Sequence, residues 1–276
     1  VTRTSSLYPH ATLVCASTSQ NVNTGPFNWT IMTEPKPIRI NKYLSEVGYC
    51  SRRAADKLIE QGRITINGAR PEKGTKVMPG DEVCVNGQPV GEAPTTPVYL
   101  AFNKPVGIVC TTDTRVEKNN IIDYINYPTR IFPIGRLDKP SEGLIFLTND
   151  GDIVNKILRA SNNHEKEYIV EVDKRVDRAF CRRMANGIPI LDTVTKPCTV
   201  EKMGTFLFRI VLTQGLNRQI RRMCEHLGYS VLSLKRVRIM NVTLDVPVGQ
   251  WRDLTSEELQ EIHRLTADSH KTFTPQ

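Results

Sequence analysis

One carboxylate stands between two bases in the segment Gly135-Arg136-Leu137-Asp138-Lys139, which joins two apolar, strand-like runs. Nearby positive charge favours the ionised form of a carboxylic acid, so we expect Asp138 to be an anion at neutral pH. Such an anion could act as a nucleophile or as a general base. The alternative is a structural role, in which the Asp138 side chain caps the backbone of a polar turn.

A second candidate segment, residues 217–227, has the apolar periodicity of a helix. At 100° per residue its apolar residues share one face, and Arg218, Arg221 and Arg222 lie on the opposite face with Glu225. Three guanidinium groups with one acid leave most of the charge unpaired, which suits contact with phosphate or with an anionic catalytic group. The alternative is a solvated basic face of a surface helix.

The other residue types that could do chemistry give weaker signals. Tyr168 opens an apolar strand, where a tyrosine more often packs in the core than stacks on a ligand. Lys104 begins the turn Lys104-Pro105-Val106-Gly107, just past a strand. The five histidines and seven cysteines lack the spacing of a metal site or a Ser/His triad, and neither GxGxxG nor GxxxxGK[ST] occurs. We therefore expect no metal and no cofactor, and a reducing compartment.

The elements that would position these residues begin with a small unit at residues 37–90, predicted as helix–helix–hairpin. Apolar residues repeat at helical spacing from Ile40, and Ser51 can cap a second helix. Asn67-Gly68 and Asn86-Gly87 each follow an alternating apolar run, a strong hairpin signal. The two helices carry a surplus of bases that predicts a phosphate-binding surface, formed by Arg39, Lys42, Arg52, Arg53 and Lys57.

The rest of the chain predicts a mixed α+β domain over residues 98–265. The strand-like runs are 98–102, 131–134, 144–147, 168–172, 206–212 and 236–240, and the helical runs are 151–158, 176–184, 217–227 and 256–265. The last helix opens with a capping box of Thr255 and Glu258. Residues 91–97 predict a linker. We expect residues 1–35 to be a disordered or non-native leader, with translation beginning near Met32, and residues 266–276 to be a disordered tail.

Composition limits the function classes. The chain has 276 residues, of which 39% are apolar, and 37 Lys and Arg against 29 Asp and Glu give a formal net charge of +8. This is enough apolar material for a folded core, and no apolar run reaches the length of a membrane span. The concentration of bases in particular segments favours a polyanionic partner, with nucleic acid first. An ordinary enzyme with a high isoelectric point is the alternative.

Taken together, these segments resemble the bacterial ribosomal-RNA pseudouridine synthases of the RsuA type. The resemblance covers residues 36–262 and keeps the family's order of motifs. These are an alpha-L RNA-binding domain (Asn41-Lys42-Tyr43-Leu44, Ser51-Arg52-Arg53-Ala54, Ile66-Asn67-Gly68), Lys104-Pro105-Val106-Gly107, Gly135-Arg136-Leu137-Asp138 with Gly143-Leu144, Lys166-Glu167-Tyr168, and the run from Gly215 to Met223. The stretches at 164–168 and 238–242 favour the RluF subgroup.

This resemblance implies a largely antiparallel mixed sheet in two halves around a cleft that holds Asp138. It also implies the isomerisation of uridine to pseudouridine in structured RNA, with Asp138 as the essential carboxylate. By similarity, Arg221 pairs with Asp138, Tyr168 stacks on the target base, and Arg136 is the candidate for the space that the flipped base leaves. Whether Asp138 attacks the ribose or the uracil ring, or abstracts a sugar proton, stays open.

The partner implied is large-subunit ribosomal RNA or its assembly precursor. Lys104, Arg218 and Arg222 are expected to contact this RNA together with the five bases of the small unit. Two alternatives are the same chemistry on small-subunit ribosomal RNA or a tRNA stem-loop, and a non-catalytic RNA-binding protein. We expect a cytoplasmic monomer with no membrane partner.

Overall fold

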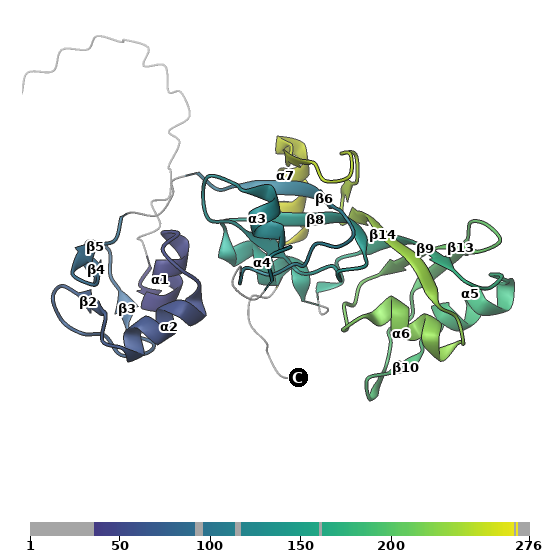
Figure 1. Ribbon diagram of the computed structural model, residues 1–276, viewed down its shortest axis with the longest axis horizontal. Helices are drawn as coiled ribbons and strands as arrows, with labels where there is room; N and C mark the ends of the chain where they lie inside the picture. The colour runs from purple at the N-terminus through teal and green to yellow at the C-terminus, as the bar shows by residue number, and fades with distance from the viewer. Residues whose placement is uncertain (1–35, 92–95, 114–116, 160–161, 268, 270–276) are drawn as a thin grey trace, which may run out of the picture. The chain divides into compact units, whose positions relative to one another are not determined.

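The computed structural model describes residues 36–91, 96–113, 117–159, 162–267 and 269 (Figure 1). The expected leader at 1–35, the centre of the expected linker and most of the expected tail lie outside these residues. Within them, none of the helices combines the length and the apolar character that crossing a bilayer requires.

The small unit has the two predicted helices and five short strands, of which β1 and β3 are additions to the sequence prediction. They are β1 (Ile38–Arg39), α1 (Ile40–Glu46), α2 (Arg52–Glu60), β2 (Ile64–Ile66), β3 (Lys76–Val77), β4 (Val83–Val85) and β5 (Gln88–Pro89). The Ser51 hydroxyl accepts a hydrogen bond from the backbone N–H of Ala54 at 3.2 Å, so the predicted cap of α2 is confirmed. Apolar residues of both helices pack on β2, β3 and β4 and form one core.

The two Asn-Gly turns of this unit differ. Asn86-Gly87 joins β4 and β5 as a tight hairpin, with positive φ at both positions as a type I′ turn requires. Asn67-Gly68 also has positive φ values, but β2 pairs with β4, and β3 pairs with β1. At the first turn Ile66 and Ala69 exchange both backbone hydrogen bonds, at 2.8 and 3.0 Å, but no strand continues from Ala69, so the expected hairpin there is limited to one bridge.

The large domain is built on a mixed sheet whose strand order among the described residues is β12-β13-β9-β14-β8-β6-β16. Its strands are β6 (Tyr99–Lys104), β7 (Phe132–Ile134), β8 (Glu142–Thr148), β9 (Lys166–Val172), β12 (Thr199–Lys202), β13 (Leu207–Leu212), β14 (Val231–Ile239), β15 (Val242–Thr243) and β16 (Trp251–Asp253). Strands β14 and β8 are parallel, and the other pairs are antiparallel. The predicted mixed, largely antiparallel sheet is therefore confirmed.

Five helices accompany this sheet in the described chain: α3 (Ile121–Ile125), α4 (Gly151–Leu158), α5 (Arg178–Ala185), α6 (Gln219–His226) and α7 (Ser256–Leu265). Helices α4 and α7 have the predicted bounds, and the capping box of Thr255 and Glu258 is formed. Helix α3, the hairpin of β10 (Pro189–Ile190) and β11 (Thr193–Val194), and strands β12, β15 and β16 are additions to the sequence prediction. Strand β14 begins five residues earlier than expected.

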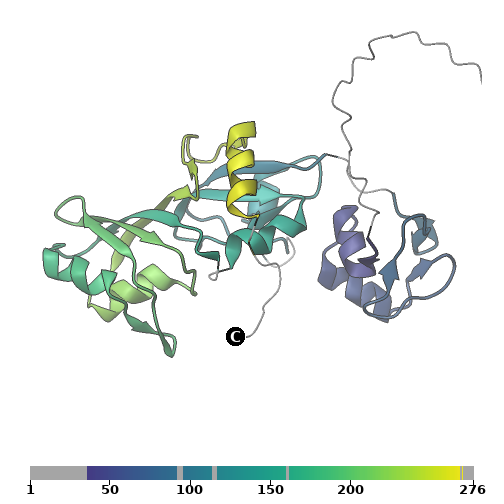
Figure 2. The ribbon, with the colours of Figure 1, turned by 180° about the vertical axis from the view of Figure 1, so that it is seen from behind.

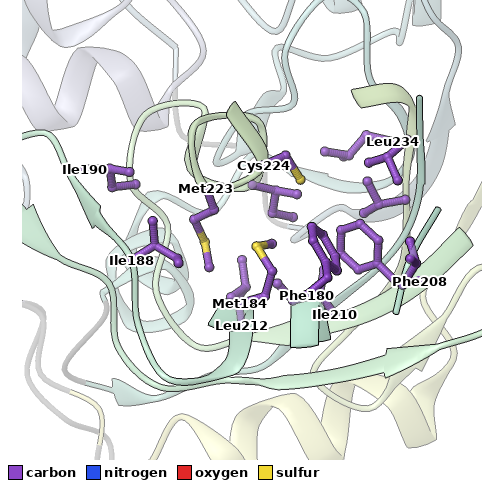
Figure 3. Close-up of a cluster of buried hydrophobic side chains, with 14 residues drawn as sticks. Phe180, Met184, Ile188, Ile190, Phe208, Ile210, Leu212, Met223, Cys224 and Leu234 are labelled. Carbon is purple, nitrogen blue, oxygen red and sulfur yellow. The ribbon is translucent and has the colours of Figure 1, made fainter. Parts of the chain in front are cut away.

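Strand β14 divides the sheet into two halves, each with its own core (Figures 1 and 2). On one side, α5 and α6 pack on β9 and β13 around Phe180, Phe208 and Met223 (Figure 3). On the other side, alternate residues of β6 and β8 face opposite ways. One face packs against α4 and α7, and the other packs against α3. The two halves meet at the strands β9, β14 and β8.

Candidate active site

A cavity of about 330 Å³ lies at this seam, within the volume range of ligand-binding sites. Four segments that are far apart in the sequence line it. They contribute Asp138 from the loop between β7 and β8, Tyr168 from β9, Arg221 from α6 and Arg236 from β14. The fold therefore brings all three predicted catalytic residues, Asp138, Tyr168 and Arg221, to one cavity.

Asp138 lies in the tight loop that follows β7. Gly135 begins this loop with φ +80°, and a Cβ there would come within 2.8 Å of the Leu158 side chain, so the loop needs glycine. The backbone of the loop closes on itself, because Ser141 N–H donates to the Asp138 carbonyl at 3.0 Å. The half-buried Asp138 carboxylate itself has no hydrogen bond or ion pair with any described residue. It does not cap the turn, which removes the structural alternative for this side chain.

The two basic residues that flank Asp138 in the sequence, Arg136 and Lys139, point to different places. Arg136 is exposed and lines the cavity. The exposed Lys139 lies 3.5 Å from Glu117, outside the cavity lining. Of these two flanking residues, only Arg136 lines the cavity together with Asp138.

Arg221 is buried beside this loop and holds it by hydrogen bonds. Its guanidinium donates to the Pro140 carbonyl at 3.0 Å, to the Ser141 hydroxyl at 3.4 Å and to the Val231 carbonyl at 3.3 Å. Burial lowers the pKa of Arg221, and the negative charge of Asp138 acts in the opposite direction. The expected Asp138–Arg221 ion pair is not formed in this structure. Arg221 instead supports the loop that carries Asp138 through hydrogen bonds to Pro140 and Ser141, within electrostatic reach of the carboxylate.

The helical periodicity predicts that the three arginines of this segment share one exposed face, and this prediction is wrong. Arg218 precedes α6 in the left-handed conformation, with φ 50°, and lines the cavity. Arg222 donates to the backbone and side-chain oxygens of Asn217 at 3.1 and 3.2 Å, and it does not line the cavity. The reason is that α6 begins only at Gln219 and is buried on two sides, so Arg221 lies inside while Arg222 folds back along the chain.

Tyr168 packs in the core and also reaches the cavity. The side chain is half-buried and packs against the cores of both halves of the sheet. It also lines the cavity, with the Arg236 guanidinium carbon 5.9 Å from the centroid of its ring. The ring is thus fixed by packing while part of it faces the cavity.

Lys104 is a correction to the expected RNA contacts. Its side chain has 0% exposure, and its ammonium donates to the carbonyls of Pro105 and Ile108, both at 2.8 Å. Burial lowers the pKa of Lys104. A cation enclosed in this way holds the turn after β6 together and does not reach a nucleic acid.

The predicted phosphate-binding surface of the small unit is largely accessible. Arg39, Arg52, Arg53 and Lys57 are exposed. Lys42 is half-buried and lies 3.2 Å from Glu46, so part of its charge is compensated.

Sequence reasoning missed two buried cations of the cavity, Lys166 and Arg236. Lys166 stands two residues before Tyr168, and this spacing places both on the same face of a strand. Arg236 could not be placed, because its contact with Tyr168 depends on the pairing of β14 with β9.

Comparisons with known proteins agree with this architecture. Residues 98–226 match the family model of RNA pseudouridylate synthases, and residues 38–83 match that of the S4 domain. The chain is 56% identical over 246 residues to the dual-specificity RNA pseudouridine synthase RluF of Escherichia coli, a match that covers 88% of this chain and 84% of that protein. It is 32% identical to the ribosomal large subunit pseudouridine synthase B of Bacillus subtilis, over 85% and 99% of the two chains. A crystal structure of a pseudouridylate synthase matches 83% of this chain and 99% of its own, with a TM-score of 0.60 and 29% identity.

Proposed function

Since this chain belongs to the RsuA-type RNA pseudouridine synthases, which isomerise uridine to pseudouridine in RNA, we propose that it acts on large-subunit ribosomal RNA with Asp138 as the essential carboxylate. Support for the substrate comes from the two curated relatives, of which one is named for the large ribosomal subunit. The other is named for dual specificity toward RNA, which leaves room for a second substrate, and the tRNA stem-loop is our second candidate.

The observation that carries the assignment of Asp138 is its uncompensated carboxylate at the wall of the cavity. The isomerisation breaks the bond between N1 of uracil and C1′ of ribose and forms a bond between C5 and C1′. The C5 proton is lost and N1 gains a proton, so no oxidant and no group donor is needed. A carboxylate free of protein donors is available either to attack an electrophilic carbon or to take up a proton.

The neighbouring residues have supporting roles in this proposal. Arg221 fixes the loop that carries Asp138, and Tyr168 stacks on the uracil and assists removal of the C5 proton. Since the uridine must leave its stack to enter the cavity, the exposed Arg136 is the group that fills the space it leaves. Arg218, at the rim formed by the start of α6, contacts a phosphate of the RNA.

The small unit contributes affinity without chemistry. Its exposed bases Arg39, Arg52, Arg53 and Lys57 contact RNA phosphates, and Lys42 contributes less because Glu46 compensates it. We propose that the enzyme works as a monomer, because all the groups that the reaction uses come from one chain.

Pseudouridine mapping tests the proposal. Total RNA is compared from cells that have the gene, cells that lack it, and cells that express Asp138→Asn in its place. We expect one or a few pseudouridines in large-subunit ribosomal RNA to disappear together in the second and third strains. If pseudouridines disappear only from tRNA, the substrate is tRNA and not ribosomal RNA. If the Asp138→Asn strain has the same pseudouridines as the strain with the gene, Asp138 is not needed for the reaction.

A further inference from the structure

Two basic side chains of the cavity, Lys166 and Arg236, have no role in the proposed reaction. Lys166 on β9 and Arg236 on β14 both line it next to Tyr168, and their exposed fractions are only 8% and 4%. In the pairing of these strands Arg236 lies opposite Tyr168, and Lys166 lies opposite Ile239. The two positive charges are close enough that Arg236 lowers the pKa of Lys166.

Neither cation is compensated by an acid in the described part of the chain. The Lys166 ammonium donates to the His164 carbonyl at 3.1 Å. The Arg236 Nε donates to the Leu144 carbonyl at 2.6 Å, while its Nη2 is buried and has no acceptor. No carboxylate oxygen of the described residues lies within ion-pair distance of either side chain. Buried charges are ordinarily paired, so two adjacent unpaired ones point to a missing anion.

We propose that Lys166 and Arg236 together bind a backbone phosphate of the RNA, at the nucleotide whose base enters the cavity. The inference rests on the proposed function only in taking RNA as the ligand. A phosphate at the cavity wall supplies the negative charge that both side chains lack and further acceptors for the Lys166 ammonium, and its charge relieves their mutual repulsion. A neutral uracil carbonyl would satisfy one donor but would leave the repulsion in place.

This site would also align the ribose, since the phosphate lies one ester linkage from the sugar. Because Tyr168 is the neighbour of both cations, of Lys166 along β9 and of Arg236 across the β9–β14 pairing, binding the phosphate there places the attached nucleoside near Tyr168. Lys166 and Arg236 are thus positioning residues. They fix where the nucleotide enters and do not take part in bond making.

Uridine 5′-monophosphate, uridine 3′-monophosphate and uridine are the probes of this site. Their affinities for the full-length protein are measured by NMR titration near pH 7. We expect one or both monophosphates to bind at least about tenfold more tightly than uridine, as for a hydrogen bond between charged groups. Lys166→Met and Arg236→Gln should each lose most of this preference. Lys202→Met and Arg264→Gln, exposed and outside the cavity, are the matched controls that should keep it.

The pH dependence gives a second readout that a merely structural role would not produce. Burial, and then Arg236, lowers the pKa of Lys166 to about 8. Other charged or titratable groups around it are Asp138 in the loop, Arg218 and Arg221 at α6, Tyr168 on β9, and His164. From about pH 7 to about pH 9.5 the arginines stay charged, and His164, whose pKa burial holds below its usual value, stays neutral. The preference for the monophosphates should therefore fall above pH 8 in the wild type and not in Lys166→Met.

The outcome is separable from that of pseudouridine mapping, because these probes report binding without turnover. A preference that Lys166→Met abolishes would support the phosphate site even if mapping found another RNA substrate. If the monophosphates show no preference over uridine, or if Lys166→Met keeps it, the phosphate site is wrong. Arg236→Gln is more prone to misfold, because it also loses the hydrogen bond to the Leu144 carbonyl. The result for Lys166→Met is sufficient to test the phosphate site if Arg236→Gln does not fold.

Discussion

Gly143 of β8 lies directly against the backbone of Arg236 on β14. A Cβ on Gly143 would come within 2.6 Å of the Arg236 amide nitrogen and closer still to its carbonyl oxygen, and Gly143 has φ +113°. The two residues are partners in the parallel pairing of β8 and β14. This close approach at the seam of the two halves helps to bring the loop that carries Asp138, Tyr168 and Arg236 to one cavity.

We expect Gly143→Ala to separate these strands. The alanine would combine an unfavourable φ with a clash against backbone that cannot rotate away, at a cost of about 3 kcal/mol or more in unfolding free energy. Denaturant unfolding measures this cost, and single-turnover kinetics should show a loss of activity in the variant that remains folded. Gly91→Ala is the control, since nothing lies within 4 Å of a Cβ there. Equal stability of the two variants would contradict the role of this contact.

Asp138→Asn should abolish isomerisation and leave RNA binding intact. The amide keeps the shape of the side chain but can neither attack nor accept a proton at a useful rate, so the single-turnover rate should fall by at least about 10³-fold. Excess enzyme, radiolabelled substrate RNA and an equilibrium binding assay separate the two effects. Asp192→Asn in the β10–β11 turn is the matched control, because its φ of 57° suits asparagine. Product formation above background by purified Asp138→Asn would sink the assignment.

Arg221→Lys should slow the chemical step strongly and change RNA affinity little. A lysine ammonium cannot reproduce the planar fork that reaches the oxygens of Pro140, Ser141 and Val231 together, so the loop that carries Asp138 would shift. A misplacement of this kind costs about 10²-fold in rate.

Arg218→Ala is the counterpart of Arg221→Lys and should have the reverse effect. Its guanidinium lines the cavity from a position outside α6, so we expect weaker RNA binding and an unchanged rate at saturating enzyme. Both variants are compared by single-turnover rate and equilibrium binding. Should Arg221→Lys affect binding alone, Arg221 would be a phosphate contact and not a support of the loop.

Replacing Arg52, Arg53 and Lys57 by glutamine should flatten the salt dependence of RNA binding. Each lost phosphate contact removes roughly 0.7–0.9 from the slope of log affinity against log salt, so the triple variant should lose about 2 units or more. The same replacement at three exposed arginines of α5, Arg178, Arg182 and Arg183, controls for net charge and should leave the slope unchanged. Equal slopes for all three proteins would exclude the small unit from RNA contact.

Lys166→Met should stabilise the protein, most clearly below pH 8. Below that pH both the folded and the unfolded wild type carry the Lys166 proton, and the folded state bears the full cost of the buried charge. Between pH 8 and the unfolded pKa of 10.5 only the unfolded chain binds the proton, so wild-type stability rises with pH. The advantage of Lys166→Met should therefore be up to about 3 kcal/mol near pH 7 and shrink toward pH 10.

Thermal or denaturant unfolding at several pH values measures this advantage, with Lys202→Met as the control that should show none. A loss of stability in Lys166→Met at pH 7 would mean that Lys166 has a structural function.

Local patterns in the sequence determined the elements whose cause is local. Helices α4 and α7 have the bounds that their apolar periodicity and caps predict, because Asp150 and Thr255 satisfy backbone donors within one turn. The motif around Asp138 predicted a candidate reactive loop, and this loop does line the cavity. These features depend on residues that are neighbours in the chain.

Tertiary structure alone decided which cations reach the cavity. Lys104 and Lys166 both follow or begin apolar strands and look alike in the sequence, yet one is enclosed by carbonyl oxygens and the other lines the cavity. Arg236 enters the site because β14 pairs with β9 on one side and with β8 on the other. Such pairings join residues up to about a hundred positions apart. The pattern of a single strand specifies which side chains share a face, but not the strands that will lie beside it.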